Sequence, residues 1–303
     1  MAAAATLLGA CGLAPSSPSP TITSAPTIDG VTGPPATGSP ATGEPVSELI
    51  LCEGEVFDGY EGKPFVLAGG VAADPTVRKV IRGCTFRNGS QAAIVLDEAV
   101  NVLIEDSVFE DIRSGVPGRG VFAIYIRGDH AIEDVTIRNN TFRRIGADAM
   151  QLGDTGRLVS DIRIEGNTFI GDGVGENAID VKGVGGPVVI RGNTWSGYRP
   201  CLSPSKGGTQ DCSGSEGAGV VIHEGEGAGR AHDVTVVDNV AFDNTRGIVV
   251  NHADGVTIAG NTFRDSIEVH IFVGDVTGCD LGANVFEGTG EPVVDQGSDC
   301  ATP

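Results

Sequence analysis

One pattern of apolar and polar positions returns along most of the chain. Two apolar residues flank a variable residue, two more residues follow, and then come Asn, one residue and an aromatic side chain. The closest copies are residues 135–142, 162–169, 188–195 and 256–263. Looser copies end at Phe57, Phe86, Phe109, Phe242 and Phe286. Alternation with a period of two predicts β-strands, and a unit repeated every 21 to 33 residues, with one interval of 47, predicts a solenoid.

Such a unit cannot bury its apolar face alone, so successive coils must stack. We therefore expect an all-β solenoid of about nine coils over residues 47–303. Asn tolerates the left-handed conformation of a tight turn, and its amide can bond to the next Asn in a ladder. The aromatic side chains should form a second ladder inside. The sequence has neither the LxxLxLxxN unit of leucine-rich repeats nor a Trp-Asp propeller signature.

This repeat resembles the pectate-lyase-like superfamily of right-handed parallel β-helices over about residues 47–300. The resemblance implies three short sheets, PB1, PB2 and PB3, separated by turns T1, T2 and T3. The apolar-x-apolar strand is similar to PB2, the Asn to the T2 ladder, and the Asn-Thr-Phe segment to PB3. PB1 then reads Ala178-Ile-Asp-Val-Lys182, and its counterparts begin at Ala93, Ala123, Ala149, Gly219, Gly247 and His270.

In enzymes of this superfamily the active groove runs along the outer face of PB1. If Ile179 and Val181 point inward, their neighbours point outward and form three rows. The first row, mostly small, is expected to be the floor of a groove: Ala93, Ala123, Ala149, Ala178, Gly219, Gly247 and His270. The second row is Val95, Tyr125, Gln151, Asp180, Val221, Val249 and Phe272. The third row is Asp97, Arg127, Gly153, Lys182, His223, Asn251 and Gly274.

Two long T3 segments, residues 110–122 and 196–218, should wall this groove where the polar residues concentrate. The side chains that we assign to catalysis are Lys182, Arg127, Asp180 and His223. Those assigned to substrate binding are Tyr125, Gln151, Asn177, Tyr198 and Asn251.

β-Elimination of a uronic polysaccharide needs a base for the proton α to the carboxylate and a cation for the resulting anion. Several β-helix lyases use a PB1 Lys or Arg as the base, so the resemblance implies Lys182 as base with Arg127 as its partner. These enzymes hold Ca²⁺ through Asp residues, which makes Asp148, Asp154 and Asp180 the expected oxygen ligands.

Two other functions compete with a lyase. Hydrolysis needs two carboxylates ~5–9.5 Å apart, but the Asp-Asp pair and the other motifs of polygalacturonases are missing. A non-catalytic glycan-binding or structural surface module fits the same residues. The sequence leaves enzyme and module open, and in both cases the expected partner is a polysaccharide or cell-surface glycan.

The N-terminus predicts export. The apolar run that ends in Leu8-Gly9-Ala10-Cys11 resembles a bacterial lipobox, so residues 1–11 are interpreted as a lipoprotein signal and Cys11 as the lipidation site. Residues 12–46, rich in Pro, Ser and Thr, predict a disordered tether. We expect a monomer on the outer face of the membrane or secreted, touching the membrane only through the lipid.

Cysteine usage and charge agree with export. Six cysteines follow Cys11, and the alignment of repeats suggests the pairs Cys52–Cys84, Cys201–Cys212 and Cys279–Cys300. The formal net charge of −20 argues against nucleic acid as a partner and against adsorption to an anionic membrane.

Overall fold

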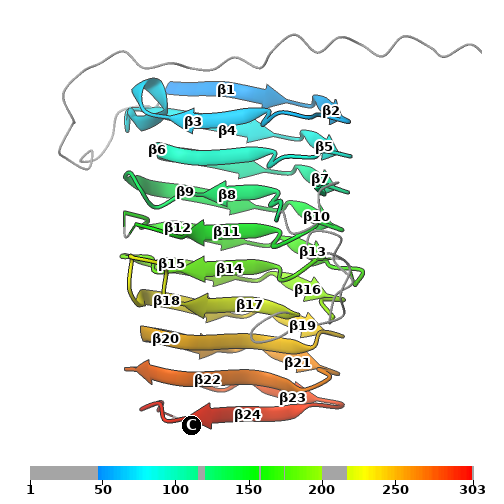
Figure 1. The fold of residues 1–303 in the computed structure, drawn as a ribbon, viewed down its shortest axis with the longest axis vertical. Helices are drawn as coiled ribbons and strands as arrows, with labels where there is room; N and C mark the ends of the chain where they lie inside the picture. Colours follow the sequence, from blue (N-terminus) through cyan, green and yellow to red (C-terminus); the bar gives the residue numbers. More distant parts are fainter. Residues whose placement is uncertain (1–46, 115–119, 157, 174, 200–216, 302–303) are drawn as a thin grey trace, which may run out of the picture.

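The chain winds into nine stacked coils (Figure 1). The computed structural model describes residues 47–114, 120–156, 158–173, 175–199 and 217–301. Each coil pairs with the next in parallel register, as in the PB3 pairs Thr141 with Thr168 and Thr168 with Thr194. The predicted right-handed parallel β-helix of about nine coils is therefore confirmed.

The strands fall into three series that follow one another in every coil. The PB1 strands are β3 (Phe65–Ala68), β8 (Ile124–Ile126), β11 (Met150–Gly153), β14 (Ile179–Lys182), β17 (Ala218–His223) and β24 (Glu291–Gln296). The PB2 strands are β1 (Ser47–Glu53), β4 (Val77–Arg82), β9 (Ile132–Arg138), β12 (Ile162–Glu165), β15 (Val188–Arg191) and β18 (Ala231–Val237). The PB3 strands are β2 (Val56–Asp58), β5 (Thr85–Arg87), β7 (Val108–Glu110), β10 (Thr141–Arg143), β13 (Thr168–Ile170), β16 (Thr194–Ser196), β19 (Val240–Phe242), β21 (Thr262–Arg264) and β23 (Val285–Glu287).

Three strands run through the corner between PB1 and PB2 without a break. They are β6 (Ile94–Glu105), β20 (Arg246–Ala259) and β22 (Val269–Thr277). Their hydrogen bonds join the expected first and second sheets into one 15-stranded sheet, beside a nine-stranded PB3 sheet. A short 3-10 helix, η1 (Gly70–Ala73), follows β3.

The predicted Asn ladder is present and structural. Its members are Asn140, Asn167, Asn193, Asn239, Asn261 and Asn284. From Asn167 onward, each side-chain oxygen accepts bonds from the backbone N–H and the side-chain amide of the ladder Asn one coil earlier, at 2.8–3.1 Å. The Asn140 oxygen, at the start of the ladder, accepts the Ser107 backbone N–H at 2.9 Å. The left-handed conformation, which we expected at these Asn residues, belongs instead to the residue before each of the first five, for example Asn139 (φ 57°) and Gly166 (φ 64°).

The aromatic ladder is also present, with one error in its predicted register. Phe57, Phe86, Phe109, Phe142 and Phe169 stack with ring centroids 4.7–5.0 Å apart, and Trp195 follows. In the next coil Ala241 takes the inward position, paired with Trp195 and Phe263. The prediction for Phe242 was therefore wrong, because its side chain points outward and is 40% exposed.

The first of the three expected outward rows points inward instead. Ala93, Ala123, Ala149 and Ala178 are fully buried. A Cβ added to Gly219 would overlap the Trp195 indole, and one added to Gly247 would lie 2.6 Å from the Phe263 ring. His270 lies beside Phe263 and Phe286, with centroids 5.9 and 5.5 Å away. These residues are small because the aromatic ladder fills the space inside this corner, so they are not the floor of a groove.

Two of the suggested disulfides are formed, and they lie near the two ends of the stack. Cys52–Cys84 joins the first two coils, and Cys279–Cys300 closes the last PB2 position. Cys201 and Cys212, the lipidation site Cys11 and the tether at 12–46 lie outside the described residues. Within the described chain no helix is long and apolar enough to cross a membrane.

Candidate functional site

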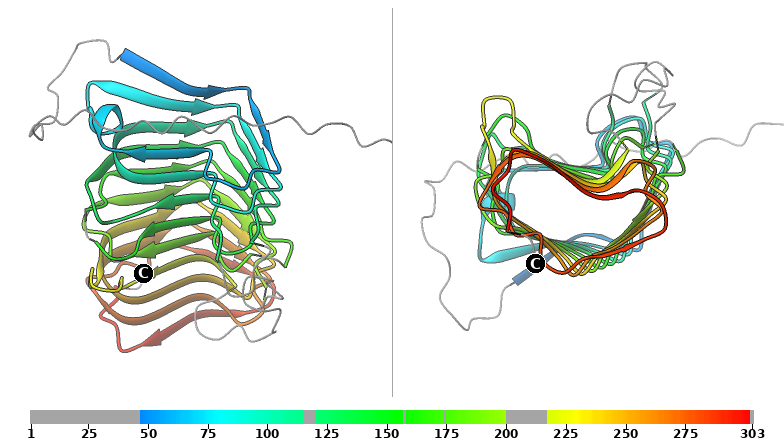
Figure 2. Two further views of the ribbon diagram at one scale, coloured as in Figure 1. Left: turned by 45° about the horizontal axis from the view of Figure 1, so that its top comes forward. Right: turned by 90° about the horizontal axis from the view of Figure 1, so that it is seen from below.

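The outer face of PB1 is concave. Viewed along the axis, the cross-section curves inward along this face, and the hairpin of residues 224–230 rises at one edge (Figure 2). That hairpin closes through the Gly225 N–H, which donates to the Gly229 carbonyl at 2.9 Å. It connects β17 to β18 and forms a wall at turn T1, whereas the sequence analysis expected walls only at T3.

Two adjoining cavities occupy this concave face, and we call them together the PB1 groove. The first has a volume of about 540 Å³ and the second about 770 Å³, and both are lined by His223 and Glu224. The first cavity is also lined by Val221, Arg246, Val249, Asn251, His252, Glu268, Val269, Phe272, Glu291 and Val294. The second is also lined by Asp154, Lys182, Gly225, Glu226, Gly227 and Gly229.

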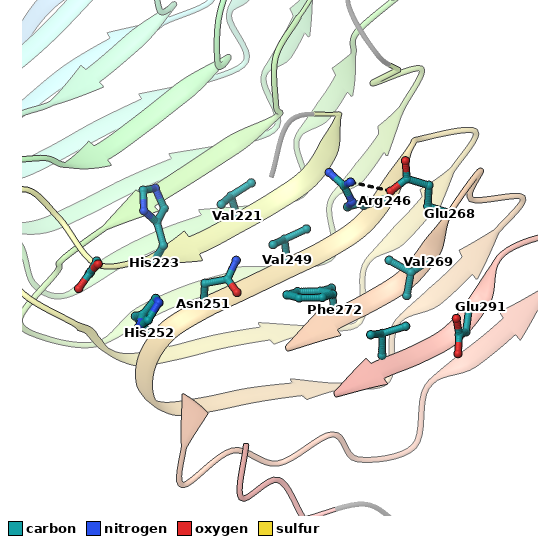
Figure 3. A pocket seen from close by; sticks show the side chains of 12 residues that line it. Val221, His223, Arg246, Val249, Asn251, His252, Glu268, Val269, Phe272 and Glu291 are labelled. Carbon is teal, nitrogen blue, oxygen red and sulfur yellow. Dashed lines mark ion pairs between the residues drawn. The ribbon is translucent and has the colours of Figure 1, made fainter. Parts of the chain in front are cut away.

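The first cavity has an apolar floor between two polar rims (Figure 3). Val221, Val249, Phe272 and Val294 stand in register on successive coils and make the floor. His223, Asn251 and His252 lie on one side of it (Figure 3). On the other side Arg246 pairs with Glu268 at 2.6 Å, next to Glu291. An apolar strip between hydrogen-bonding rims suits a ligand that has both apolar faces and polar edges.

The second and third expected rows do point outward, and they meet in one polar cluster. Asp180 accepts contacts from two basic groups, since its Oδ2 lies 3.2 Å from the Lys182 ammonium and its Oδ1 lies 3.0 Å from His223 Nε2. The Lys182 ammonium also lies 3.5 Å from Gln151 Oε1. Asp180 and Gln151, expected to be accessible, are only 5% and 3% exposed. Lys182 and His223 form the exposed part of the cluster, with 24% and 31% of their side chains accessible.

The surroundings of Lys182 keep it protonated. Burial alone would lower the pKa of its ammonium, but the negative charge of Asp180, followed by that of Asp148, outweighs burial and raises the pKa. A lysine acts as a base only after losing this proton. This environment is therefore unfavourable for the base role that the sequence suggested.

Asp148 and Asn177 lie beneath the groove rather than in it. Burial, and then repulsion from Asp180 and Glu176, raise the pKa of Asp148 well above its usual range. The Asn177 side-chain amide donates to Asp148 Oδ1 at 2.9 Å, and its oxygen accepts the Ala218 N–H at 3.0 Å. With 2% exposure, Asn177 supports the backbone, so its assignment to substrate binding was wrong.

Tyr125 and Arg127 lie together on the coil before Gln151, two coils before Asp180. The Tyr125 hydroxyl donates to Asp154 Oδ2 at 3.1 Å, and Arg127 stacks on the Tyr125 ring with its guanidinium carbon 5.9 Å from the centroid. Arg127 pairs with Asp97 at 3.6 Å. It therefore has a carboxylate partner of its own and is not the partner of Lys182.

Tyr198 was expected on a loop wall and is instead part of the core. It is 2% exposed, and its backbone N–H donates to Asn244 Oδ1 at 3.0 Å. Burial raises the pKa of its phenol. The chain turns inward here because the side-chain oxygen of Asn244, on the next coil, holds the backbone, so Tyr198 cannot reach a substrate.

The expected Ca²⁺ ligands do not form one site. Asp148 is buried against Asn177, Asp154 accepts the Tyr125 hydroxyl, and both oxygens of Asp180 face basic groups. Across the described residues no three His, Cys, Asp or Glu side chains are grouped to hold a metal. The side chains present therefore do not fit the ion.

Most residues of the first cavity carry no signal in the repeat pattern. Phe272 and Val249 were assigned to the correct row but treated as its apolar end. His252 was placed near PB1 without a role, and Arg246, Glu268 and Glu291 were not considered. A signal for the T1 wall exists in the sequence, because the Gly-rich segment 224–229 separates two strands and Gly and turns go together.

Comparisons with known proteins agree with this architecture. The family described as "right handed beta helix region" matches residues 122–286, which is more than half of the chain. The protein therefore belongs to the right-handed β-helix family. A comparison with curated proteins found no match.

Two solved structures are similar in fold. PfbA, a surface adhesin of Streptococcus pneumoniae, has 16% identity and a TM-score of 0.54, with 79% of this chain and 60% of the adhesin covered. An alginate lyase from a Paenibacillus species has 16% identity and a TM-score of 0.53, with 84% of this chain and 92% of the lyase covered. This chain thus spans less than two thirds of the adhesin, and both likenesses concern the fold.

Proposed function

We propose that the protein binds a polysaccharide in the PB1 groove and that binding, rather than catalysis, is its primary function. The observation that carries this proposal is the first cavity, in which an apolar floor on four successive coils lies between polar rims. Pyranose rings have apolar faces and hydroxyl edges, so a sugar chain matches this cross-section. That an adhesin and a polysaccharide lyase share the fold is consistent with a glycan ligand.

The proposal includes the location of the protein. Two disulfides at the ends of the stack suit an oxidising compartment outside the cytoplasm. A lipid on Cys11 and a tether at 12–46 would then present the groove to a surface glycan.

The test is a glycan array followed by titration calorimetry, with Phe272→Ala as the informative variant. Phe272 is the aromatic member of the floor, and truncating such an anchor weakens binding by about tenfold or more. Thr257→Ala, on the outer face of PB2, is the matched control and should bind as the wild type does. Equal losses in both variants, or no binding to any glycan, would refute the proposal.

Catalysis is a second candidate, supported by the contact between Asp180 and His223. A carboxylate that holds one ring nitrogen orients the other toward substrate, so His223 is better suited as the base of a β-elimination than Lys182. Lys182 would remain an ammonium that faces the substrate. The assay follows the ultraviolet absorbance of the 4,5-unsaturated product on pectate, alginate and glycosaminoglycans. Activity lost in His223→Ala and in Lys182→Ala would establish it, and no absorbance on any polyuronate would exclude it.

A further inference from the structure

Negative and positive charges along the PB1 groove are not balanced. The acidic side chains that line its two cavities are Asp154, Glu224, Glu226, Glu268 and Glu291. The permanently cationic side chains are Lys182 and Arg246, and each is already paired, Lys182 with Asp180 at 3.2 Å and Arg246 with Glu268 at 2.6 Å. Neither cation is left to neutralise an incoming anion.

Apart from Asp154, which accepts the Tyr125 hydroxyl, three of the acids have no such partner. Glu224, Glu226 and Glu291 are exposed, and none forms an ion pair with another described residue. Glu224 and Glu226 project from the hairpin wall on the T1 side, whereas Glu291 stands on the opposite rim, where β24 begins. Uncompensated negative charge therefore flanks the apolar floor on both sides.

This arrangement decides which glycans the groove accepts. A polyuronate would bring a carboxylate on every sugar next to these acids, and like charges across an interface oppose binding. A sugar with a protonated amino group would find a partner on either rim while its ring packs on Val249 and Phe272. The floor extends over three coil spacings of ~4.8 Å, or about 14 Å, which suits a short run of sugars.

We propose that the ligand of the PB1 groove is a glycan with free amino groups, a polymer of de-N-acetylated hexosamine. The proposal rests on the glycan-binding function proposed above and specifies its substrate class. Glu224, Glu226 and Glu291 recognise the ammonium groups, and Phe272 with its apolar neighbours carries the rings.

The experiment is calorimetric titration with a glucosamine tetramer at about pH 6, where glutamates remain ionised, in low salt. The test variant combines Glu224→Gln, Glu226→Gln and Glu291→Gln. Its control combines Glu55→Gln, Glu61→Gln and Glu133→Gln, which removes the same charge from exposed positions outside the groove. Each exposed ion pair contributes a factor of about 1.5 to 5, so the test variant should bind about tenfold more weakly or worse, and the control within about twofold of wild type.

Three results would overturn the substrate class: tighter binding of a galacturonate tetramer, equal binding of an N-acetylglucosamine tetramer, or equal losses in test and control variants. If a neutral or N-acetylated glycan binds and Phe272→Ala weakens it, the binding function stands and only the charge argument fails. If none of these oligosaccharides binds, the substrate class fails, and the glycan array decides whether the binding function stands.

Discussion

Replacing Asn167 by Ala tests whether the Asn ladder stabilises the solenoid as the structure implies. The side-chain oxygen of Asn167 accepts the Asn140 N–H at 2.9 Å and the Asn140 amide at 3.0 Å. Its own amide donates to the Ile137 carbonyl at 2.9 Å and to Asn193 Oδ1 at 3.0 Å. The substitution removes all four bonds at a site that is 1% exposed, where water cannot replace them.

The magnitude follows from which groups lose a partner. The backbone N–H of Asn140 is left buried and unpaired, which costs about 1–3 kcal/mol, while the Asn140 amide keeps its bond to the Ile104 carbonyl. The remaining lost bonds contribute about 0.5–1.5 kcal/mol each. We expect the free energy of unfolding to fall by about 3–7 kcal/mol.

Urea unfolding followed by the fluorescence of Trp195, the single tryptophan, measures this loss. Asn284→Ala is the matched control, because Asn284 ends the ladder and is only half-buried, so water can reach the groups it leaves. It should lose about 1–2 kcal/mol. Equal losses in the two variants, or less than about 1 kcal/mol for Asn167→Ala, would refute a buried, cooperative ladder.

Two further predictions concern the core and the buried acid beneath the groove. Gly219→Ala should lower the free energy of unfolding by about 1–3 kcal/mol because the new methyl overlaps the Trp195 indole. Gly62→Ala, with no atom within 4 Å of the added methyl, should change it by less than about 0.5 kcal/mol. Similar urea midpoints for both variants would contradict the inward orientation of the row that contains Gly219. Asp148→Asn should stabilise the protein at neutral pH and have little effect near pH 3. Burial raises the pKa of Asp148 in the folded state. The stability that the protonated acid contributes is therefore fully present below the unfolded pKa of about 3.9 and is lost as pH rises through the folded pKa. Thermal melts of both proteins at the two pH values check this prediction. If Asp148→Asn changes the stability equally at both pH values, or lowers it at neutral pH, the folded protein ionises Asp148 at no cost.

The fold was predictable because its determinants are local and repeated. The spacing of Val135, Ile137, Asn140 and Phe142 returns in coil after coil, so one reading of the unit applied to nearly all of them. Prediction failed where one coil departs from the rest. At Ala241 and Phe242 the sequence offers an aromatic residue one position late. The spacing from the ladder Asn indicates position 241, and the pairing with Trp195 and Phe263 shows that Ala241 faces inward.

The candidate site was predictable in part. Alternation along β14 placed Asp180 and Lys182 on the outer face, and register brought His223 beside them. Alternation could not show that the row of Ala178 and Gly219 points inward, because a corner of the coil breaks the two-residue period. It also could not show that Tyr198 is buried.

By itself the sequence determined the coil, the ladders and the disulfide pairs at the two ends, because each depends on residues at fixed spacing. Only the tertiary structure decided which exposed face is hollow and what charge it carries. The groove joins Lys182, Glu224, Phe272 and Glu291, which lie up to 109 residues apart in the chain. Depth, burial and ion pairing are properties of several coils together, so no single repeat contains them.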